Sequence, residues 1–281
     1  MLLERYKEWG FPQDPRTKIK YSIRLNPLRD NDTIHRLRKE GVKLAKVEFA
    51  ENGFNYESRF PLASTIEYLL GQFYIQEASA QLPGEIISRD LKSKDVKILD
   101  MCAAPGGKTS QLSEVLENKG HIVALDIKKE RVEKLCFNLE RMHCTNVEVH
   151  TQDSKEITGE YDYVLLDAPC SGNYSSEMNW FARRKVSDFK NRQKLQKELL
   201  KTAAKVVKKG GIIIYSTCSL EKEEDEDVVE YGLKELGLEL QDTKIDFGEK
   251  GLTKETEKCL RIWPTQHKYP GFFVAKLKKL S

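Results

Sequence analysis

The sequence predicts an α/β protein with a doubly wound parallel sheet, a terminal antiparallel hairpin and a small α+β module before them. From residue 96 onward, short apolar runs alternate with amphipathic stretches, which is the pattern of strands joined by crossover helices. Near the end of the sequence, two apolar runs flank a turn at Pro264–Gly271, and they predict the hairpin. Before residue 70, apolar residues change between the strand repeat and the helix repeat, which predicts the separate module.

The elements of the module follow from apolar spacing and from one cap signal. Residues 1–20 predict a short helix and then an irregular stretch. Ile19–Leu25 alternates apolar and polar side chains as a strand does, and Val42–Phe49 repeats the pattern with one slip. Between these strands, Asn31-Asp32-Thr33 is typical of a helix amino-terminal cap. The module is therefore predicted to be a β-α-β arrangement.

The elements of the larger part follow in chain order. Residues 71–80 lead into a predicted helix that runs to about Arg89. The predicted strands of the sheet are 97–101, 121–126, 147–151, 163–167 and 212–216. The predicted helices begin after Gly107, cover Val132–Met142 and cover Asp188–Lys208, and the hairpin strands are 260–263 and 272–277. This organisation predicts one domain at residues 1–70 and a second at residues 71–281.

Composition limits the class of protein. The chain has 281 residues, of which 39% are hydrophobic and 32% are charged, as in a globular protein. It has no apolar stretch of membrane-spanning length and no apolar signal core at its start, so we expect a cytoplasmic protein without a membrane partner. Its six cysteines include no CxxC pair, so we expect neither a disulfide framework nor a metal site. Cys136, Cys144 and Cys259 are interpreted as small apolar core residues.

Charge is distributed unevenly along the chain. Residues 183–209 hold eleven basic and two acidic residues, a net charge of +9, and residues 1–50 hold twelve and seven, a net charge of +5. Residues 217–257 hold five basic and fourteen acidic residues, a net charge of −9. Basic blocks of this kind favour a polyanionic partner, although a solvated helix face has the same composition.

Three predicted strands end in polar loops, and ligands of open α/β sheets bind at the carboxyl ends of strands. The loop Cys102–Thr109 contains two glycines and leads into a helix, so its backbone can approach a ligand. Asp126 is placed to accept ribose hydroxyls, and Asp153 and Arg131 are further candidates for the same nucleoside. A P-loop needs glycine where Cys102 stands, and the dinucleotide motif is absent, so neither alternative is favoured.

Two further strands end in cysteines. Cys170 follows a run that ends in Asp167-Ala168-Pro169, and Cys218 follows a run that ends in Ser216-Thr217. Two thiols beside a glycine-rich loop indicate covalent chemistry on a substrate that is held next to a nucleotide-like cofactor. At this point either cysteine is suited to be the nucleophile.

These motifs together resemble the Sun-type RNA (cytosine-5)-methyltransferases, also known as the nucleolar proliferation-antigen family. The resemblance covers nearly the whole chain in order and is carried by Arg24-Leu25-Asn26, Tyr74–Glu77, Asp100–Thr109, Asp167–Gly172, Ser216–Ser219, Arg261–Pro264 and Gly271–Phe273. It implies a Rossmann-like S-adenosylmethionine-dependent methyltransferase sheet and, for residues 1–70, a small basic RNA-binding module.

The resemblance also implies roles for individual residues. Cys218 matches the thiol that attacks carbon 6 of cytosine, and Cys170 matches the thiol that assists release of the product. Asp167 matches an acid that contacts both cytosine and cofactor, and Lys108 matches a lysine that reaches the base and the cofactor. The implied contacts to S-adenosylmethionine are Cys102, Ala103, Ala104, Pro105, Gly106, Gly107, Lys108, Asp126, Arg131, Asp153 and Asp167. DNA cytosine-5 methyltransferases use the Pro-Cys thiol as nucleophile, so the Thr-Cys pair favours RNA.

The substrate expected from the sequence is RNA, with transfer RNA favoured because the chain is compact, and no obligate protein partner is expected. Lysine-rich surfaces also suggest an archaeal-like member of the family. A ribosomal-RNA methyltransferase with the same chemistry is an alternative, and a catalytically silent RNA-binding scaffold is another. Residues 173–184 depart from the family pattern, and their aromatic side chains either stack on an unpaired base or pack in the protein.

Overall fold

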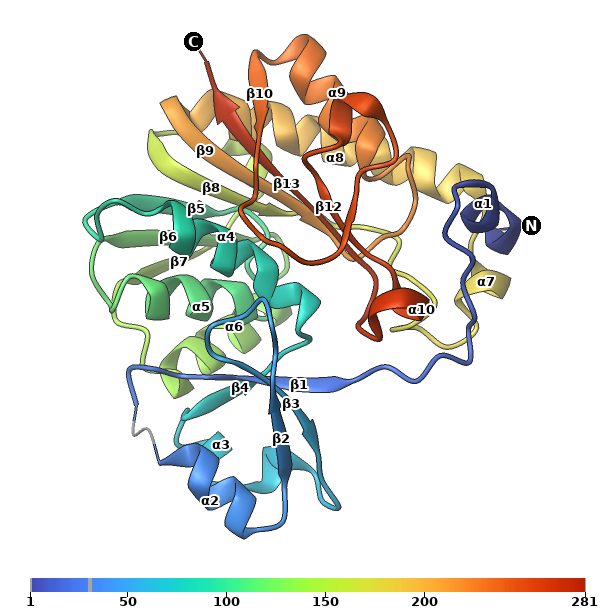
Figure 1. The fold of residues 1–281 in the computed structure, drawn as a ribbon. Coiled ribbons are helices and arrows are strands. Elements are labelled where there is room, and N and C mark those ends of the chain that lie inside the picture. Colours follow the sequence, from blue (N-terminus) through green and yellow to red (C-terminus); the bar gives the residue numbers. More distant parts are fainter. Residues whose placement is uncertain (1, 30–31, 281) are drawn as a thin grey trace. The chain divides into compact units, whose positions relative to one another are not determined.

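The computed structural model describes residues 2–29 and 32–280. The chain divides into two compact units, one made of residues 1–19 and 154–281 and the other of residues 20–153 (Figure 1). Each unit is described by itself. None of the described helices is both long and apolar enough to cross a lipid bilayer.

The unit at residues 20–153 contains a four-stranded antiparallel sheet with strand order β2-β3-β1-β4. Its elements are β1 (Tyr21–Leu25), α2 (Thr33–Lys39), β2 (Lys43–Lys46), β3 (Gly53–Glu57), α3 (Ile66–Leu69) and β4 (Phe73–Ile75). The two helices cover this sheet, and Ile23, Leu37 and Phe73 are fully buried in the core between them. Strands β3 and β4 were not predicted, because each is short and has no sustained alternation. Asp32 stands at the cap of α2, where its side chain makes no capping hydrogen bond to the helix, and Asn31 lies outside the described residues.

The same unit contains three parallel strands in the order β5-β6-β7. The strands are β5 (Lys97–Asp100), β6 (His121–Asp126) and β7 (Val147–Thr151), and the helices are α4 (Leu82–Asp90), α5 (Gly107–Val115) and α6 (Lys129–Arg141). All three predicted strands are confirmed within a residue. Asp126 pairs with Thr151 at the ends of β6 and β7, so the loops after these strands leave the sheet at one edge.

The small sheet and the parallel strands are joined by a buried ion pair. Arg24 of β1 donates from Nε and Nη2 to both carboxylate oxygens of Glu114 in α5, each at 2.7 Å. Arg24 also donates to the carbonyl of Gly107, the first residue of α5, at 2.8 Å. The guanidinium therefore connects the module to the helix that follows the predicted cofactor loop.

The other unit contains two parallel strands, β8 (Tyr161–Asp167) and β9 (Val207–Thr217), with antiparallel strands beside them. Strand β13 (Phe272–Lys279) pairs antiparallel with β9, and β12 (Leu260–Ile262) and β10 (Leu238–Gln241) pair antiparallel with β13, as the predicted hairpin requires. The short β11 (Glu249–Lys250) pairs with β12. Asp167 lies opposite Ser216, so the two cysteine loops leave adjacent strands at the same level.

Helices complete this unit. They are α1 (Leu2–Glu8), α7 (Trp180–Arg183), α8 (Val186–Val206), α9 (Glu226–Glu235) and α10 (Pro264–His267), and short 3₁₀ turns lie at 154–156 and 254–256. The predicted long helix is confirmed as α8, which runs along β8 and β9 (Figure 1). Helix α1 packs by Tyr6 against Trp263, with ring centroids 5.9 Å apart. Helix α9 and strand β10 were not predicted from the sequence.

Candidate active site

The predicted cofactor loop Cys102–Lys108 connects β5 to α5 and has a conformation that requires glycine. Gly106 has φ of +105°, which is rare for any residue with a Cβ. A Cβ at Gly106 would also lie 3.0 Å from Cδ1 of Leu135. The loop is fixed to the next strand by the Ala103 N–H, which donates to the carbonyl of Leu125 at 2.8 Å. These contacts hold the backbone N–H groups of the first turn of α5 at the edge of the sheet.

Asp100, at the end of β5, stabilises the conformation of the loop by hydrogen bonds. Its carboxylate accepts a hydrogen bond from Thr109 Oγ1 at 2.7 Å and a longer one from the Cys102 N–H at 3.4 Å. Asp100 is buried, so this carboxylate acts on the loop conformation. The sequence placed Asp100 and Thr109 in the motif but did not predict this role.

Asp126 and Arg131 lie together beside the loop. Asp126 is buried, its Oδ1 accepts from the Lys128 N–H at 3.1 Å, and its Oδ2 lies 3.2 Å from Nη1 of Arg131. Arg131 also donates from Nη2 to the carbonyl of Ala104 at 2.7 Å, so it connects Asp126 to the loop. Apart from the ion pair, no hydrogen bond reaches Oδ2 from the described part of the chain. A buried carboxylate such as Asp126 can accept hydrogen bonds from the hydroxyls of a ribose, and the free N–H groups at the start of a helix can bind a carboxylate. The two together fit an adenosyl amino acid.

The two remaining predicted residues of this unit lie at the same sheet edge. Lys108 is the second residue of α5 and is half-buried. Burial raises the pKa of Tyr74, and the positive charge of Lys108 acts against that rise. Asp153 follows β7 and is half-buried. Their roles toward base and cofactor stay predictions.

The structure brings the two cysteines of the other unit into contact. Cys170 Sγ lies 3.0 Å from Cys218 Sγ, and both side chains are half-buried. The pKa of the Cys170 thiol is raised well above its ordinary value by the hydrogen bond with Cys218, by burial, and by the nearby charges of Cys218 and Glu224. Cys170 is therefore harder to ionise than a free thiol.

Asp167 stands at the end of β8, three residues before Cys170. It is half-buried, and its Oδ1 accepts a hydrogen bond from Ser216 Oγ of β9 at 2.8 Å. This bond orients the carboxylate from the strand that leads to Cys218. The structure thus groups Asp167 with both cysteines.

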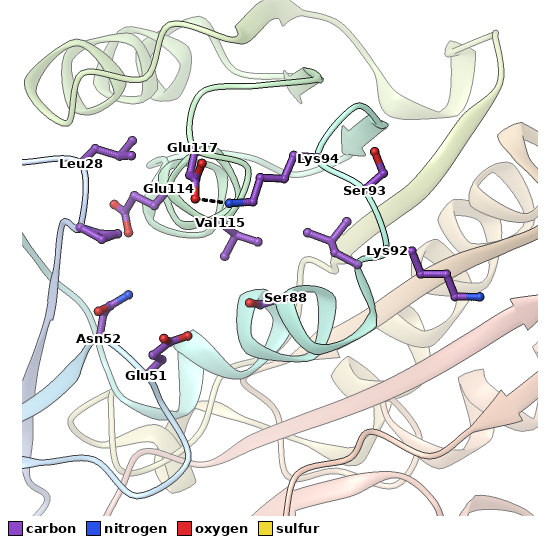
Figure 2. A pocket seen from close by; sticks show the side chains of 12 residues that line it. Leu28, Glu51, Asn52, Ser88, Lys92, Ser93, Lys94, Glu114, Val115 and Glu117 are labelled. Carbon is purple, nitrogen blue, oxygen red and sulfur yellow. Dashed lines mark hydrogen bonds and ion pairs between the residues drawn. The ribbon is translucent and has the colours of Figure 1, made fainter.

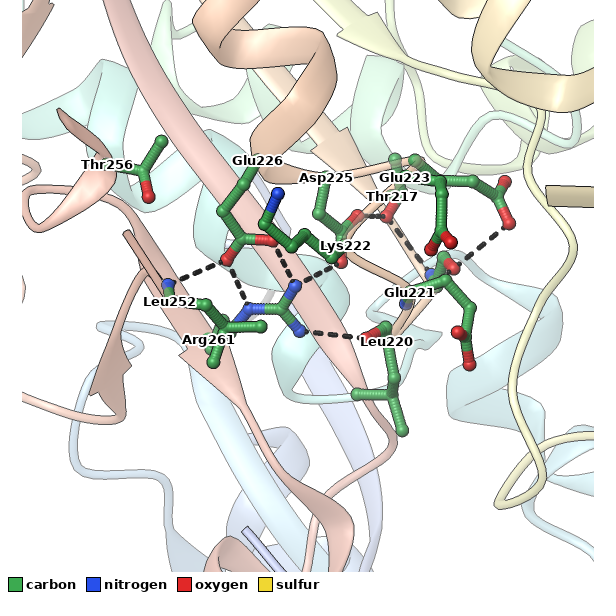
Figure 3. A network of polar contacts seen from close by, with 12 residues as sticks. Thr217, Leu220, Glu221, Lys222, Glu223, Asp225, Glu226, Leu252, Thr256 and Arg261 are labelled. Carbon is green, nitrogen blue, oxygen red and sulfur yellow. Dashed lines mark hydrogen bonds and ion pairs between the residues drawn. The ribbon is translucent and has the colours of Figure 1, made fainter. Parts of the chain in front are cut away.

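The turn after Cys218 is held by a buried network of charges (Figure 3). Thr217 Oγ1 donates to Asp225 at 2.6 Å and accepts from the Ser219 N–H at 3.1 Å. Arg261 of β12 donates to the carbonyl of Leu220 at 3.1 Å and lies 3.0 Å from Asp225 Oδ2. Burial alone would lower the pKa of Arg261, but the charges of Glu226 and Asp225 raise it above its ordinary value.

A cavity of about 460 Å³ opens beside Cys170. Two arginines and an asparagine border it, and its lining residues are Cys170, Ser171, Arg184, Asp188, Asn191, Arg192 and Leu195. The cavity is within the size range of small-molecule sites. Its polar lining and its thiol fit a nucleotide better than an apolar ligand.

A larger cavity, of about 630 Å³, lies in the other unit and is lined by a different set of residues (Figure 2). None of the predicted site residues lines it. Two of its carboxylates already have partners: Glu114 binds Arg24, and Glu117 forms an ion pair with Lys94. We assign no function to it.

The aromatic side chains of residues 173–184 pack against other side chains: Trp180 is buried, and Tyr174 and Phe181 are half-buried. Trp180 is 1% exposed, stacks on Phe189 at 5.8 Å and donates from Nε1 to the carbonyl of Ser171 at 2.9 Å. Tyr174 stacks on Phe181 at 5.2 Å. Of the two interpretations of this segment, packing is the one that the structure favours.

Several residues around the cysteines were missed from the sequence, namely Asn173, Gln196, Glu224, Asp225 and Arg261. The acidic residues stand in a segment that the sequence analysis described only by its net charge, and Glu221, Glu224, Asp225 and Glu226 are fully buried. The available signal was the apolar pair Val228-Val229 directly after these acidic residues, because it indicates that this segment enters the core.

Comparisons with known proteins agree with this arrangement. A family model described as 16S rRNA methyltransferase RsmB/F matches residues 88–278, and one described as the N-terminal domain of 16S rRNA methyltransferase RsmF matches residues 5–78. A solved structure, a methyltransferase homolog protein from Pyrococcus horikoshii, is 32% identical, covers 99% of each chain and superposes with a TM-score of 0.86.

Two curated relatives are longer proteins. The human 28S rRNA (cytosine(4447)-C(5))-methyltransferase is 37% identical over 92% of this chain and 34% of its own length. The ribosomal RNA small subunit methyltransferase F of Shewanella woodyi is 33% identical over 94% of this chain and 58% of its own length. The chain thus spans about a third to three-fifths of the curated relatives to which it is similar.

These matches confirm the predicted fold class: a Rossmann-like methyltransferase sheet with antiparallel carboxyl-terminal strands, and a small antiparallel α+β domain before it. They also confirm the predicted cofactor, S-adenosylmethionine, as the methyl donor of the family. The chain belongs to the RsmB/F (NOP2/Sun) family of RNA cytosine-5 methyltransferases.

Proposed function

We propose that this protein methylates carbon 5 of a cytosine in RNA, with Cys218 as the nucleophile and Cys170 as the thiol that releases the product. The observation that carries the proposal is the contact between the two thiols, 3.0 Å apart at the ends of adjacent parallel strands. One base can therefore meet both sulfurs, as an addition followed by an elimination requires.

The chemistry of the chain's own residues can be written step by step. Cys218 Sγ forms a bond to carbon 6, and the electron pair of the 5,6 double bond becomes available at carbon 5. S-adenosylmethionine, when bound, supplies the methyl group. A base then takes the proton from carbon 5, the carbon 6–sulfur bond breaks, and the double bond forms again. We assign that proton to Cys170, whose sulfur lies beside the bond that must break.

The protonation of the pair supports this division of roles. The pKa of Cys170 is raised first by its hydrogen bond with Cys218, so Cys170 holds a proton before the reaction begins. Once Cys218 is bonded to carbon 6, its hydrogen bond and charge no longer raise the pKa of Cys170, so Cys170 can give its own proton to solvent water and then act as the base.

The other predicted residues would act on the base and the cofactor. Asp167, oriented by Ser216, would contact the cytosine ring, and Lys108 would reach the base and the cofactor tail. The loop Cys102–Gly107 would hold the methionyl part of the cofactor at the start of α5. Asp126 would hold the ribose, Arg131 would keep Asp126 and the loop in place, and Asp153 would lie at the adenine.

The surface of α8 supports RNA as the substrate. Its exposed basic side chains are Lys190, Arg192, Lys194, Lys201 and Lys205. Arg192 also borders the cavity beside Cys170, so the basic face continues to the thiol. Phosphate groups bind such a face without regard to sequence. We also propose that residues 1–70 contribute to RNA binding.

Ribosomal RNA is the substrate class that we propose. Both curated relatives described above are named as ribosomal RNA methyltransferases. The sequence favoured transfer RNA because the chain is compact, but neither of these relatives carries that activity in its name. A cytoplasmic location and the absence of an obligate protein partner stay predictions.

The test uses labelled S-adenosylmethionine and unmodified transcripts. Ribosomal RNA fragments and transfer RNAs are incubated in parallel, and methylated cytosines are mapped by bisulfite sequencing. We expect carbon 5 methylation at defined cytosines of ribosomal RNA. Methylation of transfer RNA alone would overturn the substrate class, and no transfer to any RNA would favour the silent scaffold.

A further inference from the structure

The peptide groups on both sides of Cys170 are held by one buried pair of side chains. The N–H of Ser171, which belongs to the peptide bond after Cys170, donates to Glu224 Oε2 at 3.0 Å. The carbonyl of Pro169, which belongs to the peptide bond before Cys170, accepts from Gln196 Nε2 at 3.1 Å. The same Nε2 donates to Glu224 Oε2 at 2.9 Å, so Gln196 and Glu224 bind each other.

This pair is inside the protein. Glu224 and Gln196 are each 0% exposed, and Gln196 comes from the middle of α8, where the helix holds it in place. Glu224 also accepts hydrogen bonds from Ser171 Oγ and, at 3.2 Å, from Ser219 Oγ. A buried carboxylate with this many donors is costly to move, because any displacement leaves polar groups without partners. We define Gln196 and Glu224 as the Cys170 clamp.

Cys218 is held by a different group. The carbonyl of Cys218 accepts from Asn173 Nδ2 at 2.7 Å, and the same amide donates to the carbonyl of Gly271 at 3.1 Å. The N–H of Ser219, in the same peptide bond as that carbonyl, donates to Thr217 Oγ1. Asn173 is 0% exposed. The peptide bond after Cys218 is thus fixed by Asn173 and Thr217, whereas the Cys170 clamp meets this loop at the Ser219 side chain.

We infer that Glu224 and Gln196 are positioning residues for product release, whereas Asn173 is a positioning residue for nucleophilic attack. The inference rests on the proposed function, because it assigns the two sets of positioning residues to the two thiols of that mechanism. Removal of the Cys170 clamp displaces the sulfur that takes the carbon 5 proton, and removal of Asn173 displaces the sulfur that bonds carbon 6. The two kinds of variant therefore slow different steps.

The two steps are measured separately. RNA with 5-fluorocytosine at the target position traps the enzyme after attack and methyl transfer, because fluorine at carbon 5 cannot leave as a proton does. The rate of trapping reports attack and methyl transfer, without the release step. Ordinary RNA reports release, since a covalent protein–RNA adduct that survives a denaturing gel accumulates only when release is slow.

We expect Glu224→Gln and Gln196→Ala to trap fluorinated RNA near the wild-type rate but to accumulate adduct on ordinary RNA. Their turnover should fall by about tenfold to a hundredfold, the usual cost of misplacing a reacting group by about 1 Å. Asn173→Ala should lower the trapping rate by a similar factor and accumulate no adduct. The matched control is Glu221→Gln, which alters a buried carboxylate of the same segment whose side chain binds Tyr6 instead of a cysteine loop.

Folding of each variant is checked by circular dichroism before the rates are compared. The release arm has two variants on different elements, and Asn173→Ser stands in for Asn173→Ala if the latter does not fold. Equal slowing of trapping and turnover in all three variants would overturn the inference and leave the proposed function in place. Failure of the wild-type protein to trap any fluorinated RNA would overturn the proposed function and this inference with it.

Discussion

Cys170 Sγ lies 3.0 Å from Cys218 Sγ, and the residues before them, Asp167 and Ser216, are paired across two parallel strands. The contact follows from this register, because each cysteine stands two or three residues beyond the paired positions. Parallel pairing therefore explains why thiols 48 residues apart share one site. It also explains why their protonation is linked, since the hydrogen bond between them raises the pKa of Cys170.

The first prediction concerns this pair. Cys218→Ala should form no covalent adduct with RNA and should lose methyl transfer, because it lacks the sulfur that bonds carbon 6. Cys170→Ala should accumulate a stable adduct on unmodified RNA, because it lacks the base for release. A denaturing gel with labelled RNA measures both results.

The assignment of roles to the two cysteines depends on which of the two variants accumulates the adduct. Adduct in Cys218→Ala and none in Cys170→Ala would reverse the assignment and match the DNA-type mechanism. Cys259→Ala is the matched control, since that thiol is buried just before β12 and should affect neither adduct nor activity.

The second prediction concerns the ion pair between Arg24 and Glu114. Their side chains are 1% and 3% exposed, so Arg24→Met leaves a buried carboxylate without its partner. We expect a loss of about 3–5 kcal/mol in the free energy of unfolding, measured by urea denaturation. Arg24→Met/Glu114→Gln should recover part of it, because the uncompensated charge is then removed.

An exposed pair provides the control. Lys43 and Glu57 form an ion pair at 2.9 Å with side chains 81% and 76% exposed. Lys43→Ala should change the free energy of unfolding by less than about 1 kcal/mol. A loss in Arg24→Met no larger than this would show that the buried pair does not stabilise the connection to α5.

The third prediction concerns RNA binding by α8. Affinity should fall linearly with the logarithm of salt concentration, and Lys190→Gln/Lys194→Gln should reduce the magnitude of that slope by about 0.7–0.9 for each phosphate group that the variant no longer binds. Fluorescence anisotropy with labelled RNA at several salt concentrations measures it. The control variant Lys250→Gln/Lys254→Gln removes two exposed lysines from the acidic segment and should leave the slope unchanged. Equal slopes in all three proteins would exclude α8 as a phosphate-binding surface.

The fourth prediction is a pH dependence of stability. Burial raises the pKa of Glu221 to about 7 from its ordinary 4.5, although the Tyr6 hydroxyl and Arg5 lower it. The folded state thus binds this proton more tightly than the unfolded state, so stability falls as pH rises between these two values. The loss should be on the order of 3 kcal/mol by pH 8.

The comparison that isolates Glu221 is with Glu221→Gln, which cannot ionise. Urea denaturation at pH 5 and at pH 8 should show a larger loss for the wild-type protein than for the variant. A wild-type protein that gains stability over the variant between these pH values would contradict the prediction.

The parallel strands and the long helix α8 could be predicted because their signals are local. Strands β5, β6, β8 and β9 are apolar runs between turn residues, β7 alternates valine with polar residues, and α8 repeats its apolar residues every three or four positions. Strands β3 and β4 lacked such a signal, because they are short and only half-buried and owe their existence to pairing with β1. Pairing with a distant strand is not encoded in the spacing of a segment's own residues.

The acidic segment after Cys218 shows that charge composition alone does not predict which residues are buried. Its composition is that of a solvated surface, yet Asp225 and Glu226 are buried because Arg261, 35 residues beyond Glu226, forms ion pairs with both of them. A buried charge is stable only when its partner is present, and the partner here comes from another strand. The sequence alone could not bring these three residues together.

The sequence by itself determined the parallel strands, the order of the motifs, and which residue types stand at the strand ends, because these depend on neighbours in the chain. It also predicted a glycine-dependent loop after β5, and Gly106 there has a conformation that few other residues adopt. Only the tertiary structure decided how the cysteines are held: Glu224 and Gln196 at Cys170, and Asn173 at Cys218. The physical reason is that a hydrogen bond between distant residues exists only once the strands and helices that carry them have packed, and no local pattern records it.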